Sequence, residues 1–152
     1  MKVERIIETC LYVTDLDQAY DFYQKILGLE SFSRQNQRHL FFRCGNQVLL
    51  LFKASETKKQ DSEVPAHGMS GEGHVAFSIS ETDLGNWRRH LLESNIPIER
   101  EISWSNGGKS IYFRDPSGNS LELTTPQTWG LPEQSTTEPK INNRRYYKML
   151  EL

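Results

Sequence analysis

The 152-residue sequence has few of the features that would point to a membrane or to a nucleic acid. Its longest apolar runs fall well short of the roughly 20 residues that a helix needs to cross a bilayer. Its formal net charge is −2, so it has no basic surplus of the kind that binds nucleic acid. We therefore expect neither a membrane span nor a nucleic-acid partner.

Cysteine is equally scarce. Cys10 and Cys44 both lie in apolar stretches typical of strands, so we expect small buried side chains and no disulfide framework. The opening residues contain Glu4 and Glu8 and lack a small-residue cleavage motif, so they do not resemble a secretory leader. The expected compartment is therefore the reducing cytoplasm.

The chain is long enough for one compact domain. Typical domains have roughly 100–200 residues, and this chain has 152. Aromatic residues make up 11% of it, which argues against disorder because such side chains need to be buried.

The first half alternates between strand and helix patterns. Residues 3–13 are rich in apolar and β-branched residues and predict a strand. Asp15 then offers a helix N-cap with Gln18 three positions later, and Gly28 ends the helical pattern. Three short strand patterns follow, at 29–34, 40–44 and 48–52.

The second half repeats this order. Residues 74–80 predict a strand, Ser80 and Asp83 repeat the cap spacing, and Pro97 stops the helix. Further strand patterns lie at 98–104, 109–114 and 119–124. The chain thus divides into a first βαβββ module (1–53), a linker (54–73), a second βαβββ module (74–126) and a C-terminal tail (127–152).

The two modules are also similar in sequence. FRCGNQVLL at 42–50 aligns with FRDPSGNSLEL at 113–123 when two residues are inserted in the second turn, which places Leu49 opposite Glu122. A four-stranded sheet with one helix cannot cover both of its faces, whereas two such units can cup around a shared cavity. We therefore expect an α+β fold in which two tandem βαβββ modules form a cupped mixed sheet.

Strand alternation directs an acidic side chain into this cavity. Leu121 and Leu123 belong on the helix side, so Glu122 points the other way and needs a partner. His74 opens the first strand of the same module, and Glu8 has nearly the same register in the first module. One imidazole and two carboxylates suit Zn, Mn, Fe(II), Ni or Co, although isolated His and Glu residues are more often structural.

Three motifs carry a family resemblance: LYVTDLDQAYDFY at 11–23, GHVAF at 73–77 and YFRDPSGNSLEL at 112–123. In these motifs the sequence resembles the vicinal oxygen chelate superfamily, which includes glyoxalase I, fosfomycin-resistance proteins, bleomycin-resistance proteins and extradiol dioxygenases. The resemblance covers residues 4–126. It implies a glyoxalase-like fold with a divalent metal bound between the modules by His74, Glu122 and Glu8, the last standing where His or Gln is commoner.

The resemblance also implies a function. We expect a metal-dependent enzyme that chelates a small oxygen-rich substrate, acting as a lyase, isomerase, epoxide-opening transferase or ring-cleaving dioxygenase. Glyoxalase I has a fourth ligand, a Glu, on the strand equivalent to 48–52, and this chain has Leu49 in that role. A three-ligand site is therefore expected, and one His with two carboxylates disfavours the dioxygenases. The alternatives are a metal-free, ligand-sequestering protein of the bleomycin-resistance type and a scaffold or stress protein whose cup is vestigial.

Three residues are candidates for acid–base catalysis. The resemblance suggests Glu8 as a base and matches Tyr112 to a tyrosine on the penultimate strand of fosfomycin-resistance proteins. His67 could swing over the cup from the linker as a proton donor, although a loop histidine is more often simply solvated. A homodimer is expected because two-module members generally pair. Whether Glu8 joins His74 within one chain or across two stays open.

Overall fold

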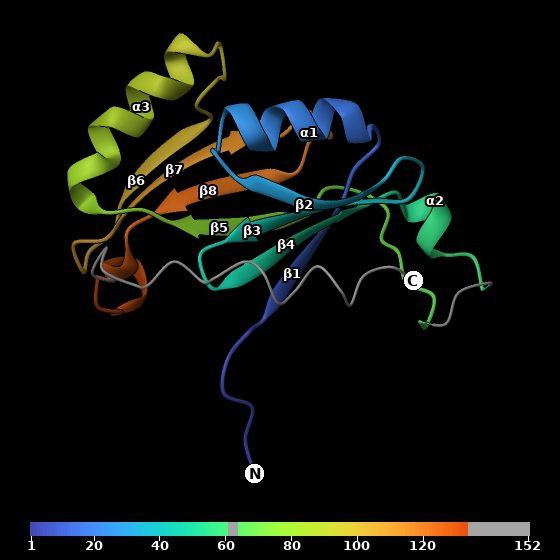
Figure 1. Ribbon diagram of the computed structural model, residues 1–152. Helices are drawn as coiled ribbons and strands as arrows, with labels where there is room; N and C mark the ends of the chain where they lie inside the picture. The colour runs from blue at the N-terminus through green and yellow to red at the C-terminus, as the bar shows by residue number, and fades with distance from the viewer. Residues whose placement is uncertain (61–63, 134–152) are drawn as a thin grey trace.

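The computed structural model describes residues 1–60 and 64–133, which form two similar units (Figure 1). The first unit consists of β1 (Glu8–Tyr12), α1 (Leu16–Lys25), β2 (Glu30–Gln35), β3 (His39–Cys44) and β4 (Gln47–Phe52). The second consists of β5 (His74–Ser78), α3 (Leu84–Glu93), β6 (Arg100–Ser103), β7 (Lys109–Arg114) and β8 (Ser120–Thr124). A short helix and two 3₁₀ turns complete the described structure: α2 (Ala54–Thr57), Glu81–Asp83 and Pro126–Trp129. The expected α+β fold with two βαβββ modules is confirmed.

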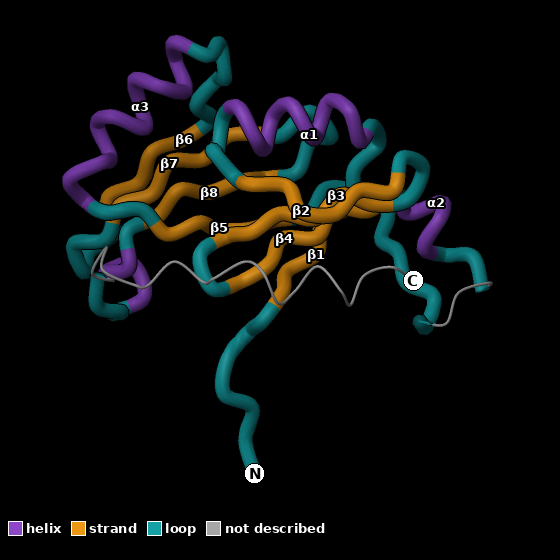
Figure 2. Tube along the Cα trace, viewed as in Figure 1, coloured by secondary structure: helices purple, strands orange, loops and turns teal. Residues whose placement is uncertain are grey.

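Each unit forms a four-stranded mixed sheet. The strand orders are β1-β4-β3-β2 and β5-β8-β7-β6. In each sheet one pair of neighbouring strands is parallel, β1 with β4 and β5 with β8. Helices α1 and α3 lie on the same side of the two sheets, and β1 and β5 adjoin at the sheet edges (Figure 2). Each sheet therefore has one face that neither of these helices covers, which we call its open face.

The module boundaries at residues 53, 73 and 126 remain predictions. The expected C-terminal tail is described only as far as residue 133, and the rest of it lies outside the described residues.

The two long helices begin differently. Asp15 caps α1 as expected, because its Oδ1 accepts the backbone N–H groups of Asp17 and Gln18 at 2.8 and 3.0 Å. Ser80 does not cap α3 in this way, because its hydroxyl donates to the Asp83 carboxylate at 2.8 Å. A 3₁₀ turn therefore comes first, and the α-helix starts about one turn later than the capping pattern predicted.

The last two strands of each unit reveal a register error in the sequence alignment. Arg43 pairs with Val48, so four residues (44–47) separate the paired positions in the first unit. Arg114 pairs with Ser120, so five residues (115–119) separate them in the second. The second turn is longer by one residue and not by two.

The predicted pairing of Leu49 with Glu122 is consequently wrong. Leu49 is 2% exposed and lies in the core, as Leu121 does, and both pair with a core phenylalanine on the preceding strand. Leu50 is the true counterpart of Glu122. The first unit therefore still has an apolar residue where the second has its buried carboxylate.

A buried polar network joins the two units. The Asp115 carboxylate accepts the Tyr23 hydroxyl at 2.9 Å and the Asn119 side-chain amide at 2.8 Å. Asn119 also donates to the Tyr12 carbonyl at 3.0 Å and accepts the Gly73 N–H at 2.7 Å. Helix α1 and the end of β1 are thereby connected to the turn before β8 and to the start of β5.

The cysteines depart from expectation. Cys10 is exposed and Cys44 is only half-buried, and both are free thiols. Cys10 lies on the open face because strand alternation sends its neighbour Leu11, 2% exposed, into the core.

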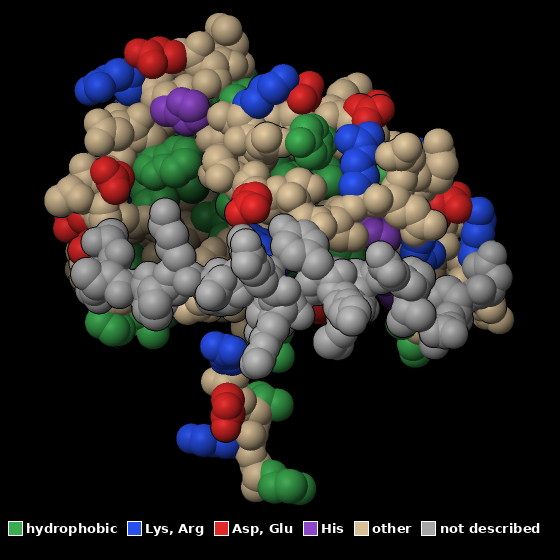
Figure 3. Space-filling view, in the orientation of Figure 1, with side chains coloured by type: hydrophobic (Ala, Val, Ile, Leu, Met, Phe, Trp, Pro, Cys, Tyr) green, Lys and Arg blue, Asp and Glu red, His purple; other side chains and the backbone are tan. Residues whose placement is uncertain are grey.

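On the face shown in Figure 3, basic and acidic side chains are interspersed, and no continuous basic area appears among the described residues. None of the helices in the described ranges is long and apolar enough to span a bilayer.

Tyr23→Phe tests the network between the units. Burial and the Asp115 carboxylate raise the pKa of Tyr23, so its hydroxyl stays protonated and donates to Asp115. Loss of this donor to a buried charged group is expected to lower the free energy of unfolding by about 1–3 kcal/mol in urea denaturation. Tyr20→Phe, at a partly exposed position on the same helix, is the control. Equal stability of the two variants would contradict the role of the network.

Candidate metal centre

His74 and Glu122 come together on the open face of the second unit. β5 and β8 are parallel, and the register pairs His74 with Ser120 and Ala76 with Glu122. The His74 Nε2 lies 3.4 Å from the Glu122 Oε2. The Glu122 side chain is 8% exposed, whereas that of His74 is 52% exposed, so the pair is accessible from the imidazole side.

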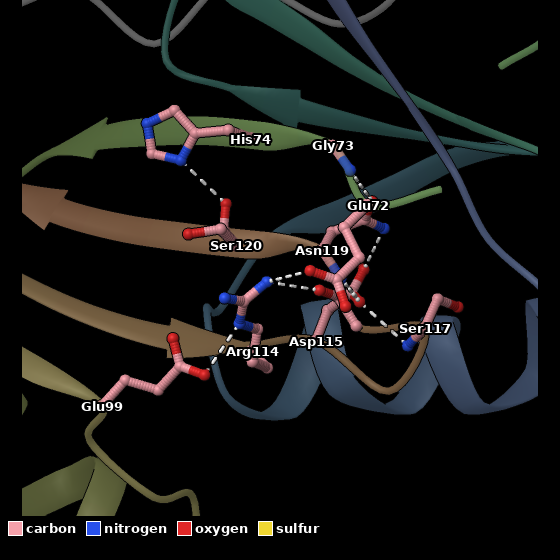
Figure 4. A network of polar contacts seen from close by, with 10 residues as sticks. Glu72, Gly73, His74, Glu99, Arg114, Asp115, Ser117, Asn119 and Ser120 are labelled. Atoms are coloured by element: carbon pink, nitrogen blue, oxygen red, sulfur yellow. Dashed lines mark hydrogen bonds and ion pairs between the residues drawn. The ribbon is translucent and has the colours of Figure 1, made fainter. Parts of the chain in front are cut away.

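The hydrogen bonds of His74 fix the role of its ring. Nδ1 lies 3.0 Å from the Ser120 carbonyl oxygen (Figure 4). A carbonyl only accepts, so Nδ1 carries the proton and donates. The neutral ring then presents a lone pair at Nε2, which faces a carboxylate oxygen. Two acceptors in this position call for a proton or a cation between them, and an imidazole oriented by a backbone carbonyl is typical of a metal ligand.

The second oxygen of Glu122 already has a partner. The Ser110 hydroxyl donates to Glu122 Oε1 at 2.5 Å and itself accepts the Trp104 indole N–H at 2.9 Å. The carboxylate is therefore held with Oε1 occupied and Oε2 directed at His74. The donor chemistry of this pair fits a divalent cation.

Tyr112 lies beside the pair on the neighbouring strand β7. It is directly opposite Glu122 in the β7–β8 register, and its ring stacks with that of His74 at a centroid distance of 6.4 Å. Partial desolvation, followed by the hydrogen bond and charge of Glu122, raises the pKa of Tyr112. The phenol therefore stays protonated and can act as a donor on this face.

Glu8 is the structural counterpart of His74 but does not join it. The two residues pair with equivalent positions of β4 and β8, Val48 and Ser120. Gly73, next to His74, lies against Leu11, which is three residues and roughly 10 Å along β1 from Glu8. Within residues 1–60 and 64–133, no group of three or more His, Cys, Asp or Glu side chains is arranged to hold a metal ion.

His67 lies over the open face of the first unit. Its Nδ1 is 2.6 Å from the Tyr12 hydroxyl, and its ring meets that of Phe52 edge-on at 4.9 Å. Its backbone N–H donates to the Thr57 carbonyl at 2.9 Å, which folds the connection back onto this unit. Desolvation and then Cys10 raise the pKa of Tyr12 to about 12, so the phenol is protonated.

The predicted catalytic and ligand residues therefore fall into two groups. Glu8 and His67 belong to the first unit, and His74, Tyr112 and Glu122 belong to the second. None of the contacts recorded for His67 in the described part of the chain reaches the second group.

The sequence did not reveal the hydrogen bonds and ion pairs that hold the backbone in place at the start of β5. Asn119 holds the backbone of Gly73, immediately before His74, and Arg114 bridges Glu99 at 2.9 Å and Glu72 at 2.7 Å (Figure 4). The DPSGN turn was visible as a motif, but its side chains bond to residues of other elements that lie 46 to 107 positions away in sequence.

The fold and this two-residue centre define a class of two-module βαβββ proteins with a candidate metal centre on an open sheet face. Residues 5–123 match the Glyoxalase/Bleomycin resistance protein/Dioxygenase superfamily, and the chain belongs to this family. The family predicted from the sequence is thereby confirmed.

Two curated relatives and one solved structure show the degree of similarity. Metallothiol transferase FosB of Staphylococcus epidermidis (strain ATCC 12228) is 29% identical over 130 residues, covering 82% of this chain and 84% of the relative. The protein of the same name from Shouchella clausii is 30% identical over 115 residues, or 74% of each chain. A lactoylglutathione lyase structure from Agrobacterium tumefaciens has 37% identity and a TM-score of 0.83, covering 86% of this chain and all of that one.

Ser110→Ala tests whether the serine holds Glu122. The buried carboxylate would lose its donor at Oε1, and we expect a loss of about 1–3 kcal/mol in the free energy of unfolding. Ser103→Ala, at an exposed position of β6, should change stability by less than about 0.5 kcal/mol. In a Glu122→Gln background the effect of Ser110→Ala should shrink, and an unchanged effect in this double-mutant cycle would refute the coupling.

Proposed function

We propose that the protein is a metal-dependent enzyme that acts on a small oxygen-rich substrate together with a small thiol. The observation that carries this proposal is the 3.4 Å approach of His74 Nε2 and Glu122 Oε2, two acceptors on an accessible sheet face. The thiol is suggested by the relatives, one a metallothiol transferase and the other a lactoylglutathione lyase. A reducing, cytoplasmic compartment would suit such a reaction.

In this proposal His74 and Glu122 hold a divalent ion (Zn, Mn, Fe(II), Ni or Co), with Glu8 of a second copy as third ligand. The ion, when bound, would polarise a substrate oxygen and stabilise negative charge on it. Ser110 keeps the Glu122 carboxylate oriented, and the protonated Tyr112 donates a hydrogen bond to the substrate from the neighbouring strand.

A homodimer would complete the centre. Because helices α1 and α3 lie on the same side of the two sheets (Figure 2), both open faces lie on the opposite side, and we expect a second copy to be needed to close the cup. The first unit of a second copy, placed over the second unit of the first copy, would bring a Glu8 to the His74–Glu122 pair. The same arrangement would bring in His67, already positioned by Tyr12, as an acid or base.

Transfer of a thiol is favoured over the lyase reaction. The resemblance to glyoxalase I implies an acidic fourth ligand on the last strand of the first unit. The register puts Leu50 at the position equivalent to Glu122, and Leu50 is apolar and 9% exposed. Three ligands would leave positions on the ion for the substrate.

Glu122→Gln tests the metal centre. The purified protein should contain a divalent metal by elemental analysis, and calorimetric titration of Mn²⁺ or Zn²⁺ should show the variant binding at least about 100-fold more weakly. Glu93→Gln, on the exposed side of α3, should bind as the unmodified protein does. A chain that takes up no metal, or whose ligand binding survives a chelator unchanged, would instead be a ligand-sequestering protein.

Subunit mixing tests the shared cup. Glu8→Ala and Glu122→Ala should each abolish tight metal binding as homodimers. An unfolded and refolded equal mixture should regain about one quarter of the unmodified metal content, because half of the dimers are mixed and each has one intact site. Mixing without any regain would show that Glu8 does not act across the interface, provided that size exclusion confirms a dimer.

A further inference from the structure

The Ser110 hydroxyl, which holds the Glu122 carboxylate, has a use for each of its hydrogen-bonding groups. A serine hydroxyl has one proton to donate and two lone pairs with which to accept. Its proton goes to Glu122 Oε1 at 2.5 Å, because an ionised carboxylate only accepts. Its two other partners are the Trp104 indole N–H and the Thr124 hydroxyl, each 2.9 Å away. An indole N–H only donates, so the Trp104 contact has one direction.

The direction of the contact between Ser110 and Thr124 follows from the same count. Since Ser110 gives its only proton to Glu122, this contact is a hydrogen bond only when Thr124 donates. The Thr124 proton has two further acceptors within reach, Thr128 Oγ1 at 2.9 Å and the Lys109 carbonyl at 3.3 Å. A hydroxyl that accepts hydrogen bonds becomes a stronger donor, so donation to Ser110 strengthens its bond to the carboxylate.

The hydroxyl groups of this cluster are shielded from water. Ser110 is 1% exposed and Thr124 is 6% exposed. The 3₁₀ turn Pro126–Trp129 lies against them through the contact of Thr128 with Thr124. Asn106 fixes this turn, because its side-chain amide donates to the Thr128 carbonyl at 3.0 Å. A buried hydroxyl that loses a partner here has no bulk water to replace it, so the loss is felt at the groups that remain.

We infer that Trp104 and Thr124 are positioning residues of the candidate metal centre, which act on Glu122 through Ser110. With both donors in place, the Ser110 proton is committed to Oε1 of the carboxylate. Oε2 then stays directed at His74 and available to a cation. The inference rests on the proposed function for the presence of that cation.

The first readout is the Glu122 carboxylate itself, observed without metal as the side-chain ¹³Cδ signal of ¹³C-labelled protein. Trp104→Phe and Thr124→Val each remove one donor and should move this signal in the direction in which Ser110→Ala moves it. Neither change should move it further in a Ser110→Ala background, because both act through that hydroxyl. Thr124→Ser, which keeps the hydroxyl, should restore the signal of the unmodified protein.

The second readout is calorimetric titration of Mn²⁺. Trp104→Phe and Thr124→Val should each weaken binding roughly 3- to 10-fold, which corresponds to the loss of one hydrogen bond. Two matched controls separate positioning from packing. Trp129→Phe changes a tryptophan that is 75% exposed, and Thr128→Val removes a competing acceptor of the Thr124 proton while leaving Ser110 both of its donors. Both controls should bind Mn²⁺ as the unmodified protein does.

An unchanged Glu122 signal in both variants would overturn the inference, and so would effects that persist undiminished in the Ser110→Ala background. Equal weakening by Thr128→Val would also overturn it, because packing of the 3₁₀ turn would then account for the result. A Glu122 signal that responds as expected in a protein that takes up no metal would refute the proposed function alone. Metal uptake at unmodified affinity in both variants would refute this inference alone.

Discussion

The parallel pairing of β5 with β8 is the constraint on which the candidate centre depends. It sets His74 and Glu122 diagonally across two adjacent strands, and both point to the open face. An imidazole and a nearly buried carboxylate at this distance are stable only because other groups fix them. The Ser120 carbonyl accepts a hydrogen bond from the imidazole N–H, and the Ser110 hydroxyl donates one to the second oxygen of the carboxylate. A cation or a proton between the remaining two acceptors completes the arrangement.

The arrangement of the two units places the candidate functional side chains in two separate groups. The open faces lie side by side because the units meet at the edges of β1 and β5, with both helices on the other side (Figure 2). The two faces therefore present different groups. The first presents Glu8 and the pair of Tyr12 with His67, and the second presents the pair of His74 with Glu122. In the proposed homodimer the open faces of two copies would meet reciprocally, as isologous contacts do.

The fold and the orientation of Glu122 in the candidate site could be predicted from the sequence. Alternation of Leu121, Glu122 and Leu123 specified which side chain faces the cavity, and the Asp15 cap specified the start of α1. Turn length could not be read in the same way, so the counterpart of Glu122 was assigned to Leu49 instead of Leu50. Cys10 was misplaced because an apolar run does not reveal which of its alternating side chains meets solvent. The position of His67 depended on a hydrogen bond to Thr57 that no local pattern announces.

Asn119 has a consequence for the history and handling of the chain. Its side chain is 1% exposed and makes hydrogen bonds to the end of β1 and to the residue before β5. The two repeats are therefore joined by a common buried region. Either half made as a separate polypeptide would expose that seam to water. Linking the two halves in one chain keeps them at a high effective concentration. This would favour fusion of two duplicated units once each depended on the other for a buried interface.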